Sequence, residues 1–474
     1  MNAIIRTLLA LILLFGVPGW NAFAAPVFSS LYSFSGPDGD YANGFPAVSG
    51  NTIYDTSTYG GASFSGNLFK INIDGTGYQS LHDFNNAYPY SAPILSGNWL
   101  YGVGYQGGGI GTGFIYKLNT DGTGYTNIYN FSPLDTSGFT NDDGAYPYAG
   151  LTLSGSTLYG TTSYAGPHSC GTIWKINTDG TGFKRLYYFR GLDDGFQPWS
   201  RMVLASNKLY GAASYTIYSL DISNLNFSVL HEFSPTQGPL GTNNDGYQVI
   251  SPLLLCDSTL YGTAIQGGYY GRGTLFSVKT DGTGFTVLHH FSALDINGHN
   301  PDGAESLSNG MYGGGCLSGL LGGTLFGTAT FGGAYGSGTI FSLNRDGSNF
   351  QTLYNFSARD TNYDNSDGAE PTGMTLYDGT FYGTTYSGGS NGYGTMFSYF
   401  PAVPIGPRLH ITPYGNNVSL SWSTNFSGYS LQYSTNVGPS AKWSTMPTAP
   451  TIVNGRYTAT NTISGQRMYF RLAF

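Results

Sequence analysis

The chain has 474 residues and a formal net charge of −8, and only 9% of its residues are charged. This acidic balance argues against nucleic acid as the main partner. Aromatic residues make up 16% of the chain, which is too many for a disordered protein and enough for a large apolar core.

Residues 1–24 have the pattern of a secretory signal peptide. Arg6 precedes an apolar run from Leu8 to Val17, and Ala22-Phe23-Ala24 fits the small-x-small cleavage rule. We therefore expect an exported protein, extracellular or at the cell surface. An uncleaved anchor is the alternative, although the run is short for a bilayer span. No later segment is long and apolar enough to cross a membrane, so we expect no span in the mature chain.

Three short phrases then recur seven times in the same order. The first resembles Leu31-Tyr32-Ser33-Phe34-Ser35, the second Leu158-Tyr159-Gly160, and the third Gly394-Thr395-Met396-Phe397-Ser398. Successive units lie roughly 40 to 65 residues apart, at or above the spacing of propeller blades. The tandem array therefore predicts a repeat architecture.

Each unit contains four short runs rich in Tyr, Phe, Ile, Leu and Thr, bounded by turn residues, which favours strands over helices. In the second unit the runs are 91–95, 99–101, 114–118 and 125–131. Asp-Gly-Thr-Gly stands between the third and fourth runs, as at residues 121–124, and is a hairpin signal. Four antiparallel strands repeated radially predict an all-β fold, a seven-bladed β-propeller over residues 25–400.

The seventh unit has no fourth strand after its third run, residues 394–400. Pro401, Pro404 and Pro407 follow instead and end the sheet. The missing phrase is the one at residues 31–35, so we expect the N-terminal strand to complete the last blade and close the ring.

The phrases Leu-Tyr-Gly-Thr-Thr, Gly-Thr-Ile-Phe and Asp-Gly-Thr-Gly-Phe resemble the bacterial tandem-repeat family called GloVer, or choice-of-anchor repeat proteins. The resemblance covers about residues 27–400 and is specific, because three phrases recur in phase. It implies an exported protein. It implies no activity, because the family has no catalytic residues to carry over.

Residues 401–407 are expected to form a Pro-rich linker and residues 408–474 a separate module. Alternating runs such as 418–422 and 429–433 predict a small β-sandwich similar to a fibronectin type III or immunoglobulin-like domain. A recognition signal for an export system is the alternative to an accessory module.

Most loops that lead from one blade to the next end in Asp-Gly. These loops share a face of the predicted propeller with the loops between second and third strands. The aspartates could cap turns by accepting backbone N–H groups. Alternatively, they could ring the channel mouth and bind a cation or a polyhydroxylated ligand. The aspartates are Asp38, Asp143, Asp194, Asp245, Asp302 and Asp367.

Tyrosines on the same face are candidates for stacking on sugar rings, Tyr269 and Tyr270 among them. The alternative is that such tyrosines wedge between blades. No cofactor or metal site is predicted, because the turns offer single carboxylates. Ca²⁺ is the one ion left open.

The junction between the third and fourth units departs from the repeat. Between Lys175 and Lys208 lie six of the chain's 18 lysine and arginine residues. Arg201 aligns with Ala92 of the second unit, Trp199 takes the place of Tyr90, and the fourth unit has almost no loop between its second and third strands. These features could form a notch for an anionic sugar. Solvated surface charge is the alternative.

The histidines of the fourth strands and the three cysteines are also considered as candidate functional residues. His82, His231 and His289 fill the tyrosine position of the fourth strand and are interpreted as packing variants. The three cysteines have no metal spacing, and any two of Cys170, Cys256 and Cys316 could pair. Cys170 next to His168 could be a nucleophile or a loop cysteine without function.

The leading hypothesis is a secreted, monomeric, non-catalytic propeller that binds an extracellular polysaccharide or a surface protein. The ligand-binding candidates are Trp199, Arg201, Asp194, Tyr269, Tyr270, Asp302 and Asp367. A polysaccharide lyase or glycoside hydrolase acting on an anionic polysaccharide is the alternative, with His168, Tyr164, Asp194 and Arg201 as the residues to test. A structural cell-envelope protein is the second alternative.

Overall fold

A computed structural model describes residues 26–191, 193–238, 240–305, 315–401, 409–414, 417–423, 430–435, 442–453, 456–462 and 468–473. The predicted signal peptide, 1–24, and all of the predicted linker 401–407 except Pro401 lie outside these residues. The described residues contain strands and no helix. The chain divides into two compact units, one of which spans Phe28–Tyr399 and the other of which contains the strands from β30 onward.

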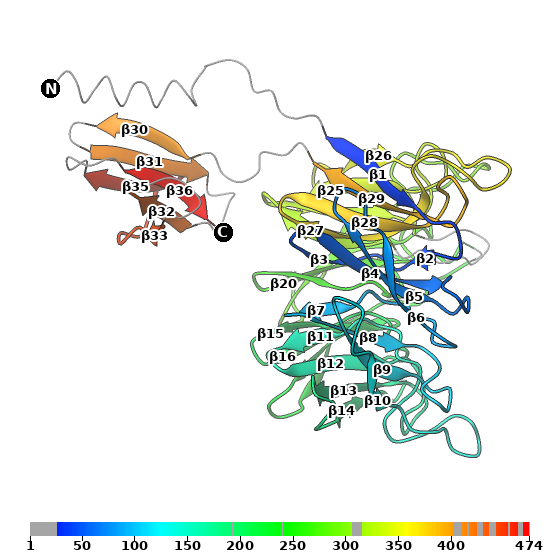
Figure 1. Cartoon of the computed structure of the whole chain (residues 1–474). Helices are drawn as coiled ribbons and strands as arrows, with labels where there is room; N and C mark the ends of the chain where they lie inside the picture. Colours follow the sequence, from blue (N-terminus) through cyan, green and yellow to red (C-terminus); the bar gives the residue numbers. More distant parts are fainter. Residues whose placement is uncertain are drawn as a thin grey trace. The chain divides into compact units, whose positions relative to one another are not determined.

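The larger unit consists of seven antiparallel sheets (Figure 1). The first sheet holds β2 (Asp40–Ala42), β3 (Ala47–Ser49), β4 (Thr52–Tyr59), β5 (Asn67–Asn72) and β6 (Gln79–Asp83). The second holds β7 (Ile94–Ser96), β8 (Trp99–Gly104), β9 (Phe114–Asn119) and β10 (Thr126–Asn130), and the third β11 (Thr152–Ser154), β12 (Thr157–Thr162), β13 (Thr172–Asn177) and β14 (Lys184–Tyr188). The fourth holds β15 (Val203–Ala205), β16 (Lys208–Ala213), β17 (Thr216–Asp221) and β18 (Phe227–Glu232), and the fifth β19 (Leu254–Cys256), β20 (Thr259–Ala264), β21 (Thr274–Lys279) and β22 (Thr286–His290). The sixth holds β23 (Leu317–Leu321), β24 (Thr324–Ala329), β25 (Thr339–Asn344) and β26 (Gln351–Asn355).

The seventh sheet joins the two ends of the repeat region. It has the order β1-β29-β28-β27, with β1 (Val27–Ser33) beside β29 (Thr395–Phe400), followed by β28 (Thr380–Ser387) and β27 (Ala369–Tyr377). The backbone N–H of Phe34 also donates to the carbonyl of Gly394 at 3.0 Å. A segment from the start of the repeats is therefore a strand of the last sheet.

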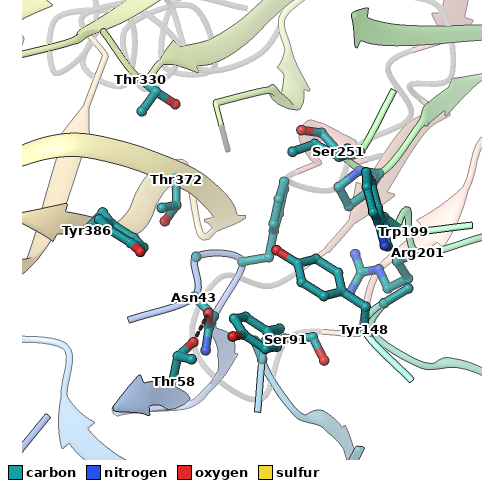
Figure 2. Close-up of a pocket in the computed structure, with 18 of the residues that line it drawn as sticks. Asn43, Thr58, Ser91, Tyr148, Trp199, Arg201, Ser251, Thr330, Thr372 and Tyr386 are labelled. Carbon is teal, nitrogen blue, oxygen red and sulfur yellow. Dashed lines mark hydrogen bonds between the residues drawn. The ribbon is translucent and has the colours of Figure 1, made fainter. Parts of the chain in front are cut away.

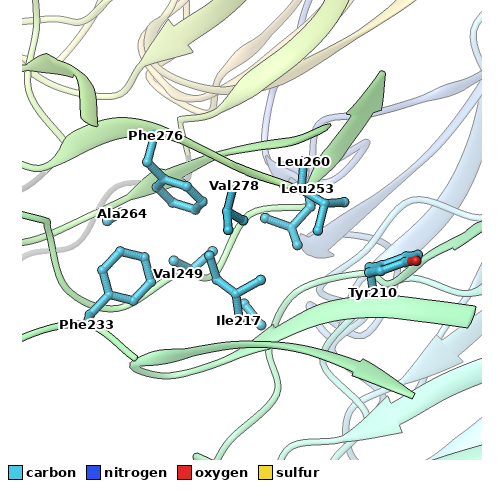
Figure 3. Packing of buried hydrophobic residues seen from close by; sticks show 10 residues of the cluster. Tyr210, Ile217, Phe233, Val249, Leu253, Leu260, Ala264, Phe276 and Val278 are labelled. Atoms are coloured by element: carbon cyan, nitrogen blue, oxygen red, sulfur yellow. The ribbon is translucent and has the colours of Figure 1, made fainter. Parts of the chain in front are cut away.

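Apolar cores lie between consecutive sheets. Between the fourth and fifth sheets, Ile217 and Phe233 pack with Phe276 and Val278, all buried (Figure 3). The glycine of Leu-Tyr-Gly makes room for such a core, because a Cβ at Gly160 would lie 2.4 Å from the Trp174 ring. Close packing of this kind explains why the phrase recurs with glycine in six of its seven copies.

The first sheet departs from this rule at Asp55, which stands in the glycine position across from Phe69. Its side chain is buried, and one carboxylate oxygen accepts only the adjacent N–H of Thr56 at 2.8 Å. Burial therefore raises the pKa of Asp55 well above its usual value.

Stacked aromatic pairs join each sheet to the next at the outer strands. A ring on the outer strand of one sheet lies parallel to a ring at the outer strand of the next, with centroids 3.5–4.8 Å apart. In the order of the sheets the pairs are Tyr32–Tyr78, His82–Tyr125, Tyr129–Phe183, Tyr187–Phe227, His231–Phe285, His289–Phe350 and Tyr354–Phe28. The last pair links β26 to β1, so the series links the sixth sheet to the seventh through the N-terminal strand. The three histidines occupy tyrosine positions in this series, as their interpretation as packing variants predicted.

The smaller unit has two sheets. One has the order β30 (His410–Tyr414), β31 (Asn417–Ser423), β35 (Arg456–Thr462) and β34 (Thr451–Val453), and the other β33 (Ser444–Thr445), β32 (Ser430–Ser434) and β36 (Tyr469–Ala473). Buried Leu420 and Trp422 of the first sheet share an apolar cluster with Leu431 of the second. Strand β34 was not among the predicted runs, because its three residues are all exposed and show no alternation.

Candidate functional site

The loop aspartates accept hydrogen bonds from the outer strand that precedes their loop. Asp143 is buried and accepts hydrogen bonds from the Tyr129 hydroxyl at 2.7 Å and from the Ser132 N–H at 3.0 Å. The tyrosine is the one in the stacked pair, so each aspartate ties the outer strand to the loop that follows it. We call this arrangement the aspartate clasp. The same contacts recur, with His289 replacing tyrosine at one of them, at Asp38, Asp194, Asp302 and Asp367.

Three of the ligand-binding candidates, Asp194, Asp302 and Asp367, therefore belong to clasps. The hydrogen bonds support the turn-capping interpretation of these aspartates over a ring of free carboxylates. At Asp194, burial acts to raise the pKa, but the hydrogen bonds from Tyr187 and Arg190 outweigh it, so the pKa is lowered. The carboxylate is thus held ionised by protein donors.

A cavity of the larger unit has a volume of about 500 Å³. Its wall contains the residues that open the innermost strand segments and residues at the ends of the second strands, such as Thr58 and Tyr386 (Figure 2). The loops that carry the clasps lead into these innermost segments. Every one of the seven sheets or its inner segment contributes at least one lining residue. A volume of this size lies in the range of about 300–1,000 Å³ that small-molecule sites occupy.

Equivalent positions of the repeat face the cavity. Counted from the loop aspartate, or from Asn85 in its place, the fifth following residue lines the wall in six sheets: Asn43, Tyr90, Tyr148, Trp199, Ile250 and Thr372. The position two residues further on holds Phe45, Ala92, Gly150, Arg201 and Pro252. The residue between these two positions is less exposed in the third, fourth and fifth sheets, where Ala149, Ser200 and Ser251 are buried. Trp199 and Tyr90 therefore occupy equivalent positions on the cavity wall, and so do Arg201 and Ala92.

Contacts with the preceding sheet hold these segments in place. In the fourth sheet, the carbonyl of Pro198 accepts the hydroxyl of Thr161 from the third sheet at 2.9 Å. The Pro198 ring packs closely on Gly171, because a Cβ added to Gly171 would lie only 2.8 Å from Pro198 Cδ. Gly171 also has a φ of +95°, which few other residues adopt. The segment that carries Trp199 is therefore anchored from a neighbouring sheet.

Aromatic rings form one side of the cavity. Tyr90 and Tyr148 stack with centroids 4.7 Å apart, and Trp199 follows at 6.2 Å from Tyr148 (Figure 2). On the seventh sheet, Tyr386 stacks on Tyr41 at 3.7 Å. Burial is the main cause that raises the pKa of Tyr148 to about 12, so its hydroxyl stays protonated and able to donate.

Two charged residues lie on the described wall. The carboxylate of Glu370 is engaged on both oxygens, by Arg359 at 2.9 Å and by the Ser387 hydroxyl at 2.9 Å. Arg201, by contrast, has no hydrogen-bond or ion-pair partner among the described residues. Its guanidinium lies over the Phe45 ring, 5.9 Å from the centroid, and burial lowers its pKa. The wall thus carries one compensated acid and one uncompensated cation.

The other predicted residues lie elsewhere. Tyr269 stacks on His290 at 3.7 Å beside a smaller hollow of about 390 Å³, and Tyr270 is exposed in the same loop. The His168 ring contacts Tyr188 of an outer strand, 5.3 Å between centroids. Of the four residues proposed for a catalytic cluster, His168, Tyr164, Asp194 and Arg201, only Arg201 lines the cavity. The structure does not bring the four together there.

The loops at the cavity end of the sheets carry many of the exposed large apolar side chains. Ile296 is fully exposed, and Tyr363 and Phe64 are exposed to 67% and 65%. Others in these loops are Ile110, Phe139, Leu240, Tyr269, Tyr270, Tyr335 and Tyr393. This end of the unit therefore offers apolar contacts around the cavity.

The described part of the chain holds no group of three or more His, Cys, Asp or Glu residues arranged to bind a metal ion. Cys170, Cys256 and Cys316 are all free thiols. Burial raises the pKa of Cys170, which is the opposite of an activated nucleophile. Within the described residues, no helix has the length and apolarity of a membrane span.

Seven sheets built from one recurring set of phrases define a tandem-repeat, all-β protein. The chain belongs to the Gloeobacter/Verrucomicrobia repeat family, whose model matches residues 22–216 and 215–403. The family resemblance read from the repeated phrases is thereby confirmed.

Comparison with solved structures finds distant likenesses. The chain is 12% identical to the extracellular domain of a hybrid two-component system from B. thetaiotaomicron, covering 85% of this chain and 42% of that one with a TM-score of 0.47. The chain is 14% identical to TolB from Acinetobacter baumannii, covering 71% of this chain and 65% of that one with a TM-score of 0.33. It is 13% identical to a chain of a nidogen/laminin complex, covering 51% of this chain and 75% of that one with a TM-score of 0.31. No curated protein matches the sequence.

Proposed function

We propose that the protein is a secreted, non-catalytic, seven-bladed β-propeller that binds an extracellular glycan in its central cavity. In this proposal residues 25–400 form the propeller, β1 closes its last blade, and residues 408–474 form a β-sandwich module. The stacked pairs that run from sheet to sheet and end at Phe28 support closure, as does the place of β1 beside β29. Export follows from the signal-like sequence at residues 1–24.

The observation that carries the binding proposal is the aromatic side of the cavity. Tyr90, Tyr148 and Trp199 come from three different sheets and meet on one wall. Flat rings beside hydroxyl groups suit sugars, because the C–H face of a sugar packs on a ring while its hydroxyl groups reach polar neighbours. None of these rings is required by the cores between sheets, in which other residues of the repeat are buried.

The exposed apolar loops around the cavity support a partner larger than a monosaccharide. A polysaccharide chain or a glycosylated surface protein would contact side chains such as Tyr363 and Phe64 while one part of it enters the cavity. We propose that the protein binds such a partner as a monomer.

A glycan array probed with the full-length mature protein tests the proposal. We expect binding to a restricted set of glycans, and at least a tenfold loss on Trp199→Ala, on the order of the 1.4 kcal/mol that tenfold represents. Trp99→Ala is the matched control, since Trp99 lies on β8 and does not line the cavity. An array with no signal would contradict the proposal and leave a structural envelope role.

A further inference from the structure

Arg201 is a cation that the fold does not need. At the same position of the repeat, other sheets have Phe45, Ala92, Gly150 and Pro252, none of them charged. The cavity wall is thus complete without a guanidinium. A role for the arginine must come from what it meets inside the cavity.

The unpaired state of Arg201 is exceptional in the described part of the larger unit. Arg185 pairs with Asp142 at 3.0 Å, Arg345 with Asp257 at 3.0 Å, and Arg359 with Glu370 at 2.9 Å. These partners accept hydrogen bonds from arginine side chains that are 30%, 32% and 24% exposed. Arg201 is partly buried, and its five N–H donors have no acceptor among the described residues, so they are available to a ligand in the cavity.

The surroundings of Arg201 position its side chain. Gly150 of the neighbouring sheet leaves space for the stem, because a Cβ there would lie 3.2 Å from Arg201 Cδ. The Phe45 ring lies beside the guanidinium at 5.9 Å. Trp199 stands two residues before Arg201 on the same wall, and Tyr148 lies next to Trp199 (Figure 2).

Glu370 does not supply the missing acceptor. Both of its oxygens are engaged by Arg359 and Ser387, as described above. The net charge that the described wall presents to a ligand is therefore positive, and it is concentrated at Arg201.

We propose that Arg201 receives a carboxylate of the ligand, so that the glycan bound in the cavity is one that contains uronic acid or another carboxylated sugar. This inference rests on the proposed glycan-binding function. The planar guanidinium can donate two parallel hydrogen bonds to a carboxylate while the adjacent rings contact the sugar face. A sulfate ester offers related oxygens, so sulfated chains are included in the experiment as a competing ligand class.

Matched acidic and neutral probes test this inference. Oligogalacturonate and oligoglucuronate would be compared with their carboxyl-reduced forms by isothermal titration calorimetry on the full-length mature protein. We expect at least one acidic probe to bind about tenfold or more tighter than its reduced form. Raising the salt concentration should weaken the acidic probe selectively, because screening acts on the charge pair.

Variants then assign the preference to Arg201. Arg201→Gln should remove the acidic preference, so that the acidic probe and its reduced form bind with similar affinity. Arg201→Lys should retain part of the preference because a point charge replaces the fork. Arg185→Gln is the control, since it removes an arginine on β14 that pairs with Asp142 and does not line the cavity. A thermal melt of each variant would verify folding, and Arg201→Lys keeps the test available if Arg201→Gln does not fold. Sulfated oligosaccharides of the same length form a second arm.

The outcomes separate the two proposals. Equal binding of acidic and reduced probes, tighter binding of sulfated than carboxylated chains, or an unchanged preference in Arg201→Gln would overturn the role of Arg201 while glycan binding stands. A glycan array on which only neutral chains bind would do the same. Failure of every glycan to bind would overturn both.

Discussion

The outer rim of the seven sheets and the wall of the cavity follow opposite rules. At the rim, the stacked pair recurs at every junction with only Tyr, His or Phe as members. On the wall, one repeat position holds Asn43, Tyr148, Trp199, Ile250 and Thr372. Rim residues pack against the next sheet and are constrained by it, whereas wall residues face open space. The comparison teaches that the repeat encodes the architecture and that its departures encode the site.

The largest difference in stability is expected between substitutions of two tryptophans, one in a core between sheets and one on the cavity wall. Trp174 is buried between the second and third sheets, and Trp199 lines the cavity. Trp174→Ala should lower the free energy of unfolding by about 3–5 kcal/mol, because it leaves a large void in a packed core. Trp199→Ala should lower it by less than about 1 kcal/mol. Urea denaturation of both variants checks this, and equal losses would contradict the distinction between core and wall.

A smaller effect is expected from two neighbouring aspartates in one loop. Asp143 is a clasp residue, and Asp142 is 95% exposed in its pair with Arg185. Asp143→Ala leaves the Tyr129 hydroxyl and the Ser132 N–H without their acceptor, so we expect a loss of about 2–3 kcal/mol. Asp142→Ala should cost below about 1 kcal/mol, as exposed pairs do. Similar melting temperatures for the two variants would contradict a stabilising role of the aspartate clasp.

The smallest effect concerns the rim histidines and appears as a pH dependence. Burial lowers the pKa of His231, whose Nε2 lies 3.5 Å from the Asp245 carboxylate. The unfolded chain then binds the proton more readily than the folded one, so the free energy of unfolding should fall as the pH drops below the usual histidine pKa of about 6.5. His231→Tyr restores the residue found at other junctions and should reduce this fall. Denaturation at pH 7.5 and pH 5.5 measures it, and an identical fall in the variant would contradict the assignment.

The predicted strands were largely found where the alternation of apolar residues placed them, because that pattern is local. The third run of the second unit, 114–118, became β9 (Phe114–Asn119). The run at 91–95 was less accurate, since β7 begins only at Ile94. Residues before Ile94 line the cavity instead of pairing, and their surroundings come from other sheets.

The candidate site was predicted only in part. Trp199 and Arg201 were singled out as departures from the repeat, and both line the cavity. Asp302 and Asp367 were singled out by recurrence, yet they belong to clasps. Tyr148 was missed because it follows the repeat, and its stacking on Tyr90 depends on a neighbour in another sheet.

The amino-acid sequence by itself determined the repeat, its strands and its family, because hydrophobic alternation and turn residues act within each unit and do not depend on where the other units lie. Only the tertiary structure decided which aspartates are engaged, which aromatic rings meet, and that Arg201 has no partner among the residues that the structure describes. Those properties depend on distances between residues of different sheets, which are set by packing across the junctions.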